Sequence, residues 1–356
     1  LAGTLIAVPD PLAALGRLAA HWRRQFALPV AVVVGSNGKT TVKEMLARIL
    51  RAAFGAEGVL ATEGNLNNAI GLPLTLLRLT AAHRAAAVEL GMHHRGETRE
   101  LAAIAQPTIV VVNNAQREHQ EFMASAVEVA AEHADAVAAL QRGGVAVING
   151  DDAHAHVWRA AAAAAGARVV TFGLAPGADV HARWTQGGDG SDVVLATPAG
   201  NAHVALAVPG RHMVSNALAA AAAALAAGAP LAAVQAGLAA FRAVPGRPVA
   251  LRSAAGAVVV DDTYNANPDS MRAAIDVLAA VPGTRWLVMG DMGEVGAAGP
   301  AFHREIGAYA RERGVARLFA LGTLARESAA ALGDGAAHYA DADALARDVA
   351  GDAHAG

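Results

Sequence analysis

The chain has 356 residues, of which 54% are hydrophobic and 17% are charged, with a formal net charge of -3. This length can bury a large core and accommodates two domains, while the small negative charge provides no basic field for nucleic acid. The absence of cysteine excludes disulfides, thiolate chemistry and cysteine-bound zinc. We therefore expect a globular, cytoplasmic protein that binds small molecules, without nucleic-acid binding or membrane insertion.

Short apolar runs alternate with helical patterns over the first two thirds of the chain. Buried strands are predicted at residues 30–34, 86–90, 108–112, 145–149 and 168–172. Helical stretches between several of these runs favour a parallel sheet, because parallel strands need crossover connections. Two alternating runs at 192–196 and 202–208 predict a hairpin on the edge of that sheet.

A Pro-Gly break within residues 243–252 ends this series and begins a second one. Strands are predicted near 257–261, 285–290 and 317–321, and helices begin near Asp269 and Pro300. We therefore place a domain boundary near residue 244 and expect two successive α/β domains.

Residues 31–50 read as a strand, a turn bracketed by glycines and an amphipathic helix. The turn fits the end of the phosphate-loop pattern G-x-x-x-x-G-K-[ST], but Val33 stands where that pattern has its first glycine. Free N–H groups at a helix N-terminus favour an anion. The candidate phosphate-binding residues are Gly35, Ser36, Asn37, Gly38, Lys39, Thr40 and Thr41.

Within this turn, Lys39 would reach the terminal phosphates and the Thr40 hydroxyl would bind Mg²⁺. The alternative is an ordinary Gly-rich turn with an exposed lysine. Lysine supplies only two of the 28 basic residues, at positions 39 and 43. A compact ammonium among so many guanidinium groups favours the phosphate-binding interpretation.

Polar residues also follow two other predicted strands. Glu89 lies at the carboxyl end of an apolar run, where open α/β sheets bind ligands, and it could share Mg²⁺ with Thr40. A lone glutamate is more often a surface or salt-bridged residue. His119 follows the next strand and by itself would be an ordinary surface histidine.

A segment rich in asparagine, TEGNLNNAIGLPLTLL at 62–77, lies between these strands. Its Asn65, Asn67 and Asn68 and its Gly-Leu-Pro turn are typical of a substrate-facing loop, although amide-rich turns are common in general.

Several short motifs occur in an order that resembles the Mur ligases. They are GSNGKTT, GNLNNAIGLPLTLL, VELGM, VNN with EH, PGRHMVSNALAA, VPGR, DDTYNANPDSM and GDMGEVG. Within the family they are similar to the branch that joins D-alanyl-D-alanine to UDP-N-acetylmuramoyl-tripeptide. The shorter loop of this family, G-[ST]-x-G-K-[ST], also accounts for Val33.

The resemblance implies a UDP-binding domain, a central ATPase and a Rossmann-like domain. The chain would then be an α/β protein truncated at both ends, with a P-loop-type parallel-sheet domain followed by a Rossmann-like α/β domain. Residues 1–28 would be a linker remnant of the UDP-binding domain, 29–243 the ATP-binding domain and 244–356 an incomplete ligase domain.

The resemblance further implies an ATP-dependent amide ligase of peptidoglycan precursor synthesis, which works through an acyl phosphate and uses ATP and Mg²⁺. We also expect a monomer. Lys39, Glu89 and His119 would be catalytic, and Thr40, Glu89 and His119 would hold Mg²⁺. Further nucleotide contacts would come from Asn216, Arg247, Asp262, Tyr264 and Asn265, and the peptide substrate would face Asn65, Asn67 and Asn68. Without the resemblance, Asn216 could equally be a helix N-cap.

One departure from the family concerns a lysine, often modified to a carbamate, that bridges metal ions. The corresponding segment, VEVAAEHADAV, has His133 at that position. Because Mg²⁺ prefers oxygen ligands, we expect His133 to bind a metal-bound water rather than the metal. The alternatives are another ligase of the Mur superfamily, such as an amino-acid-adding ligase or folylpolyglutamate synthase, and a non-catalytic nucleotide-binding module. GNLNN and YNANP argue against the sister ligases.

Overall fold

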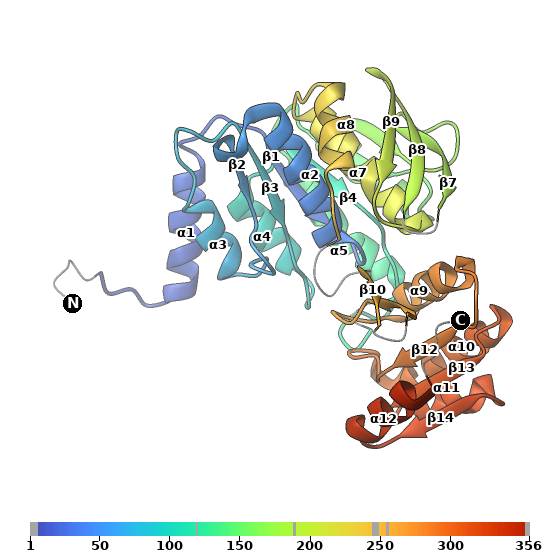
Figure 1. Ribbon diagram of the computed structural model, residues 1–356. Coiled ribbons are helices and arrows are strands. Elements are labelled where there is room, and N and C mark those ends of the chain that lie inside the picture. Colours follow the sequence, from blue (N-terminus) through green and yellow to red (C-terminus); the bar gives the residue numbers. More distant parts are fainter. Residues whose placement is uncertain (1–5, 119, 188–189, 244–248, 254–255, 353–356) are drawn as a thin grey trace.

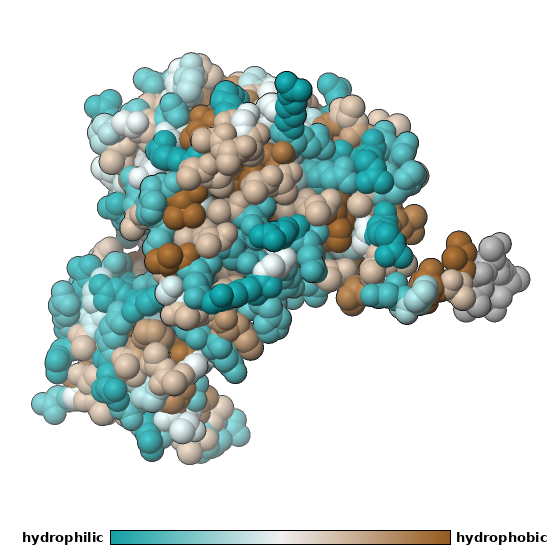
Figure 2. All heavy atoms as spheres, turned by 180° about the vertical axis from the view of Figure 1, so that it is seen from behind, coloured by the Kyte–Doolittle hydropathy of each residue, from teal (hydrophilic) through white to brown (hydrophobic). Residues whose placement is uncertain are grey.

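The computed structural model describes residues 6–118, 120–187, 190–243, 249–253 and 256–352. Figure 1 shows a larger N-terminal lobe and a smaller C-terminal lobe below it. On the face seen in Figure 2, an indentation separates the two lobes, and the hydrophobic residues lie in several separate groups. None of the described helices is both long and apolar enough to span a bilayer.

A six-stranded parallel sheet forms the centre of the larger lobe, in the order β2-β3-β1-β4-β5-β6. Its strands are β1 Val30–Val34, β2 Val59–Ala61, β3 Ala85–Glu89, β4 Ile109–Val112, β5 Val145–Asn149 and β6 Arg168–Phe172. The five strands predicted for this sheet are confirmed. Strand β2 was not predicted, because three residues are too few to show a hydrophobic pattern.

Helices cover both faces of this sheet, which explains why β1 is apolar at every position. The helices of this lobe are α1 Pro11–Arg23, α2 Lys39–Phe54, α3 Gly71–Leu76, α4 Glu97–Ala105, α5 Ala126–Ala138, α6 Ala155–Ala164, α7 Arg211–Ala226 and α8 Leu231–Ala239, with a 3₁₀ turn at Ala56–Gly58. Ala31 and Val33 pack with α2, α7 and α8 on one face, whereas Val30, Val32 and Val34 pack with α3 to α6 on the other.

The predicted hairpin lies in a separate antiparallel sheet, so its placement on the edge of the parallel sheet was wrong. This sheet has the order β7-β8-β9, with β7 His181–Gln186, β8 Ser191–Thr197 and β9 Gly200–Leu206. The inward side chains of Val193, Leu195 and Val204 join the core formed by α7 and α8. The apolar side chains of the hairpin are therefore buried against helices, and the hairpin does not pair with β6.

The smaller lobe repeats the α/β pattern around a three-stranded parallel sheet in the order β12-β13-β14. Its core includes Ile275, Met289, Ile306 and Leu318. The elements are the antiparallel ribbon β10 Val249–Arg252 and β11 Val258–Asp261, the strands β12 Trp286–Met289, β13 Arg317–Leu321 and β14 Ala336–Tyr339, the helices α9 Pro268–Ala280, α10 Gly299–Glu312, α11 Ala325–Leu332 and α12 Ala342–Asp352, and a 3₁₀ turn at Gly296–Ala298. The predicted second series is confirmed.

Candidate functional site

The turn between β1 and α2 needs glycine at two positions only. Val33 is a fully buried strand residue in register with Glu89 and Val111, so its position lies outside the turn. Gly35 has φ +143°, and a Cβ there would lie 2.9 Å from Asn113 Cβ. Gly38 has φ +81°, and a Cβ there would lie 2.5 Å from Asn216 Oδ1. Backbone conformation and close packing together explain the short form of the loop.

The segment after β4 holds this loop in place. The Asn37 N–H donates to Asn114 Oδ1 at 2.8 Å, and the side-chain amides of Asn113 and Asn114 donate to Asn37 O at 2.7 and 3.0 Å. The Ser36 N–H donates to Asn114 O at 3.1 Å. These bonds fix the loop through the neighbouring strand, so its shape does not depend on its own sequence alone.

Lys39 is the first residue of α2, and its ammonium group lies against the loop. Nζ donates to Gly35 O at 2.6 Å and to Ser36 O at 3.1 Å, and it lies 3.5 Å from Glu118 Oε2. Lys43, one turn further along α2, is fully buried and donates from Nζ to Thr62 O at 2.7 Å. Lys39 is therefore the lysine available to a ligand of the loop, and Lys43 fixes α2 to the end of β2.

Glu89 ends β3, as predicted, and only one of its carboxylate oxygens is hydrogen-bonded among the described residues. Oε1 accepts from Asn67 Nδ2 at 2.8 Å, whereas Oε2 is buried with no hydrogen-bond partner. A buried carboxylate oxygen is costly unless it is paired or binds a cation. Thr40 lines the same cavity, so the oxygen ligands present suit Mg²⁺.

His119, the third predicted metal ligand, lies outside the described residues. Within the described ranges there is no group of three or more His, Asp or Glu side chains placed to hold a metal ion. Glu118, the residue before it, lines the cavity.

A cavity of about 290 Å³ brings most of the predicted residues together, from both lobes. The predicted residues in its lining are Ser36, Asn37, Gly38, Lys39, Thr40, Thr41, Asn65, Asn67, Glu89, Asn216, Asp262, Tyr264 and Asn265. A slightly larger cavity, about 370 Å³, lies beside β2 but contains none of the predicted site residues. The smaller one has the anion-binding loop and the partnerless carboxylate oxygen, so we assign the site there.

Three more predicted residues are not part of the described lining. Asn68 does not line the cavity, and its Oδ1 accepts from the N–H groups of Ile70 and Gly71 at 3.1 and 2.9 Å, at the start of α3. Arg247 lies outside the described residues. Gly35 forms the base of the loop next to Asn113.

Asn216 is inside α7, which begins at Arg211, so the alternative interpretation of Asn216 as an N-cap was wrong. It is 5% exposed, and its Oδ1 accepts from Asn113 Nδ2 at 2.9 Å. Asn216 therefore lies beneath Gly38 and borders the cavity from the α7 side.

Sequence reasoning missed several residues of the lining, namely Gln116, Glu118, His212, Asn267 and Asp269. A local signal existed for Asn267, because asparagine before proline is typical of a helix N-cap followed by N1. The structure confirms that motif, with Asn267 capping α9 and Pro268 as its first residue.

His212, at the start of α7, lines the cavity and is partly exposed. Protein atoms nevertheless crowd its ring, and this burial lowers the pKa of His212 from 6.5 to about 4, against the opposing effect of Asp276. The imidazole is therefore neutral at pH 7.

A parallel sheet with helices on both faces and an anion-binding loop after its first central strand defines the class of phosphate-loop α/β proteins. The family description "Mur ligase middle domain" matches residues 33–224, and "Mur ligase, glutamate ligase domain" matches residues 246–356. The chain belongs to the Mur ligase family.

Relatives support the same assignment. The UDP-N-acetylmuramoyl-tripeptide–D-alanyl-D-alanine ligase of Escherichia coli (strain K12) is 40% identical over 346 residues, which cover 95% of this chain and 74% of the relative. The crystal structure of MurF from Acinetobacter baumannii has a TM-score of 0.91 and 34% identity, covering 97% of this chain and 75% of that one. A folylpolyglutamate synthase from Mycobacterium tuberculosis, 20% identical over 96% of this chain and 89% of its own, has a TM-score of 0.76 and shares the fold.

Proposed function

We propose that this chain catalyses ATP-dependent formation of an amide bond between UDP-N-acetylmuramoyl-tripeptide and D-alanyl-D-alanine, in peptidoglycan precursor synthesis. One observation carries the proposal: the phosphate loop, Glu89, the asparagine-rich segment and the C-terminal lobe line a single cavity. The E. coli relative, 40% identical, bears the name of this ligase.

The reaction has two displacement steps. A carboxylate oxygen of the tripeptide attacks the γ-phosphorus of ATP, and the bond from that phosphorus to the bridging oxygen breaks. ADP is the leaving group, and the tripeptide becomes an acyl phosphate. The amine of D-alanyl-D-alanine then attacks the acyl carbon, the carbon–oxygen bond to phosphate breaks, and the nitrogen loses a proton. Both steps need positioning and charge neutralisation more than covalent catalysis.

The loop residues 35–41 would bind the phosphates through backbone N–H groups, and Lys39 would stabilise charge that develops on the transferred phosphoryl group. Thr40 and Glu89 would hold Mg²⁺, which supplies further neutralisation of the phosphates. We keep His119 as a third candidate ligand. Asn67, through its bond to Glu89 Oε1, would orient that carboxylate.

The remaining assignments are also proposals. Asn216, Arg247, Asp262, Tyr264 and Asn265 would contact the nucleotide. Asn65, Asn67 and Asn68 would face the peptide substrate, and the bonds from the start of α3 to Asn68 Oδ1 would hold their loop in place.

The domain limits 1–28, 29–243 and 244–356, the monomeric state and the cytoplasmic location also stay predictions.

Mass spectrometry of the product tests the proposal. The protein that carries this chain should convert UDP-N-acetylmuramoyl-tripeptide, D-alanyl-D-alanine and ATP to the corresponding pentapeptide. Lys39→Ala should reduce the rate by more than tenfold, because the variant lacks the ammonium that would stabilise the charge developing on the phosphoryl group. A tenfold reduction corresponds to about 1.4 kcal/mol of activation free energy. Arg95→Ala, which removes a cation from an exposed ion pair with Glu128, is the matched control and should keep the rate.

Two results would contradict the proposal. ATP binding without any product would favour the non-catalytic module, and product only with a single amino acid as acceptor would favour a sister ligase. Retention of more than about a tenth of the rate by Lys39→Ala would contradict the role of the loop.

A further inference from the structure

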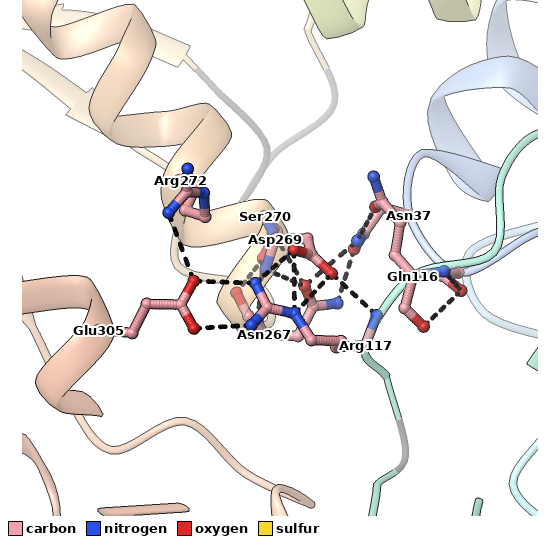
Figure 3. Close-up of polar contacts among 9 residues, drawn as sticks. Asn37, Gln116, Arg117, Asn267, Asp269, Ser270, Arg272 and Glu305 are labelled. Atoms are coloured by element: carbon pink, nitrogen blue, oxygen red, sulfur yellow. Dashed lines mark hydrogen bonds and ion pairs between the residues drawn. The ribbon is translucent and has the colours of Figure 1, made fainter. Parts of the chain in front are cut away.

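One arginine of the larger lobe binds two carboxylates of the smaller lobe (Figure 3). Arg117 Nη2 donates to Asp269 Oδ1 at 2.6 Å, and Nη1 donates to Glu305 Oε2 at 2.7 Å. The Arg117 backbone N–H also donates to Asp269 Oδ2 at 2.9 Å. Asp269 lies in the first turn of α9 and Glu305 in α10, so a single side chain joins two helices of one lobe to the other lobe.

The chemistry of this contact favours a strong interaction. The side chains of Arg117, Asp269 and Glu305 are 28, 22 and 33% exposed, so water screens them only in part. Burial pushes the pKa of Asp269 upward, but hydrogen bonds from Arg117 outweigh this and hold that pKa below its usual value. A hydrogen bond from Arg117 also lowers the pKa of Glu305. Forked bonds between guanidinium and carboxylate add geometric specificity to the attraction between the charges.

A second contact between the lobes includes the phosphate loop itself. Asn267 Nδ2 donates to Asn37 Oδ1 at 2.9 Å, and Asn37 Nδ2 donates to Asn267 Oδ1 at 3.2 Å. The same Asn267 oxygen accepts from the Asp269 and Ser270 N–H groups and caps α9. The N-terminus of α9 is thereby tied to the third residue of the phosphate loop (Figure 3).

We propose that Arg117 is a positioning residue that holds the C-terminal lobe against the phosphate loop, with the Asn37–Asn267 pair as the second contact of this latch. The latch itself is independent of the reaction catalysed. Its effect on nucleotide affinity rests on the proposed function, because Asp262, Tyr264 and Asn265 line the cavity only when the two lobes adjoin.

Resonance energy transfer between the lobes tests the latch without any assay of activity. The chain has no cysteine, so Ala199→Cys in the turn between β8 and β9 and Asp334→Cys before β14 give two unique, exposed labelling positions. In this labelled chain, Arg117→Ala should shift molecules to lower transfer efficiency, with at least a tenfold fall in the ratio of closed to open lobes. Arg117→Lys keeps the charge without the fork and should restore part of the closed population.

Two further variants distinguish loss of the latch from a general loss of ion pairing or stability in the C-terminal lobe. Arg304→Ala removes an ion pair to Glu327 of 2.9 Å that lies inside the C-terminal lobe, and it should leave transfer efficiency unchanged. Asn267→Ser keeps a capping hydroxyl for α9 but is too short to reach Asn37, and it should open the lobes without loss of thermal stability.

The kinetic readout follows from population shift. If only the closed form binds nucleotide well, opening raises the apparent KM for ATP and leaves kcat at saturating ATP nearly unchanged. Unchanged transfer efficiency in Arg117→Ala, or an equal change in Arg304→Ala, would overturn the latch. Lower transfer efficiency in Arg117→Ala from a protein that makes no pentapeptide would support the latch and contradict the proposed reaction only.

Discussion

Asn67 donates a 2.8 Å hydrogen bond from Nδ2 to Glu89 Oε1, and so joins the asparagine-rich segment to the end of β3. The other oxygen of the carboxylate, Oε2, is buried without a hydrogen-bond partner among the described residues. One oxygen is thus fixed by a neighbour while the other is left for a ligand. This arrangement connects a residue predicted to face the peptide with one predicted to hold the metal.

Replacing Glu89 by Gln should weaken Mg²⁺-dependent nucleotide binding. The substitution keeps the size of the side chain but removes the charge that attracts the cation. We expect the Mg²⁺ concentration for half-maximal ATP binding, measured by calorimetry, to rise at least tenfold. Glu57→Gln, at an exposed position of the same lobe, is the control. An unchanged Mg²⁺ dependence in Glu89→Gln would remove Glu89 from the metal site.

The phosphate loop should tolerate no side chain at residue 38. Gly38→Ala places a Cβ 2.5 Å from Asn216 Oδ1 at φ +81°, so crowding adds to backbone strain. Strain of this kind costs about 1–3 kcal/mol. Gly55→Ala has a similar φ of +84° with nothing within 4 Å of the Cβ, and it separates the two effects. We expect Gly38→Ala to lose ATP binding and Gly55→Ala to keep it; equal binding by both would contradict the close packing against Asn216.

The local hydrophobic pattern of the sequence was enough to predict much of the fold. The run 30–34 is apolar at every position because β1 is buried on both faces, and Glu89 was placed at a strand end because β3 is a similar run. The separate sheet β7-β8-β9 could not be predicted, since its alternating pattern is the same whether it pairs with β6 or packs on α7. Tertiary packing decided between these two arrangements.

In the site, too, features set by neighbouring residues could be predicted, whereas contacts between residues far apart in the sequence could not. The loop and the Asn267 cap have signatures within a few residues. The role of Asn68 stays a prediction, because an asparagine that accepts hydrogen bonds from the start of a helix and one that faces a substrate look alike in sequence. The contact of Arg117 with Asp269 joins residues 152 positions apart, so nothing near either residue indicates it.

His212 should make stability depend on pH. The pKa of His212 is about 4 in the folded chain and 6.5 in the unfolded chain. Between these two pH values the unfolded chain therefore binds a proton that the folded chain does not. The free energy of unfolding should therefore fall as pH drops from 6.5 to 4, by at most about 1.4 kcal/mol per pH unit from this group. In urea titrations, His212→Gln should lose less stability over this range than the unchanged chain. Parallel curves for the two would contradict the lowered pKa.

Bicarbonate should not affect the activity. A carbamate needs an unprotonated lysine, and the chain has only Lys39, bonded to its own loop, and Lys43, buried against Thr62 O. His133, which we predict to occupy the position of the family's modified lysine, is 2% exposed, with Nε2 3.9 Å from Glu118 Oε1. We expect the rate at fixed pH to survive removal of bicarbonate. Reversible loss of activity on that treatment would show that a lysine is modified after all.

Transfer of an oxygen isotope shows whether ligation proceeds through an acyl phosphate. The terminal carboxylate of the tripeptide is labelled with ¹⁸O on both oxygens and incubated with ATP, D-alanyl-D-alanine and the protein that carries this chain, and the released phosphate is analysed by mass spectrometry. We expect one ¹⁸O atom in each phosphate released, because the attacking carboxylate oxygen leaves with phosphorus when the amide forms. Amide formation with unlabelled phosphate would contradict this mechanism.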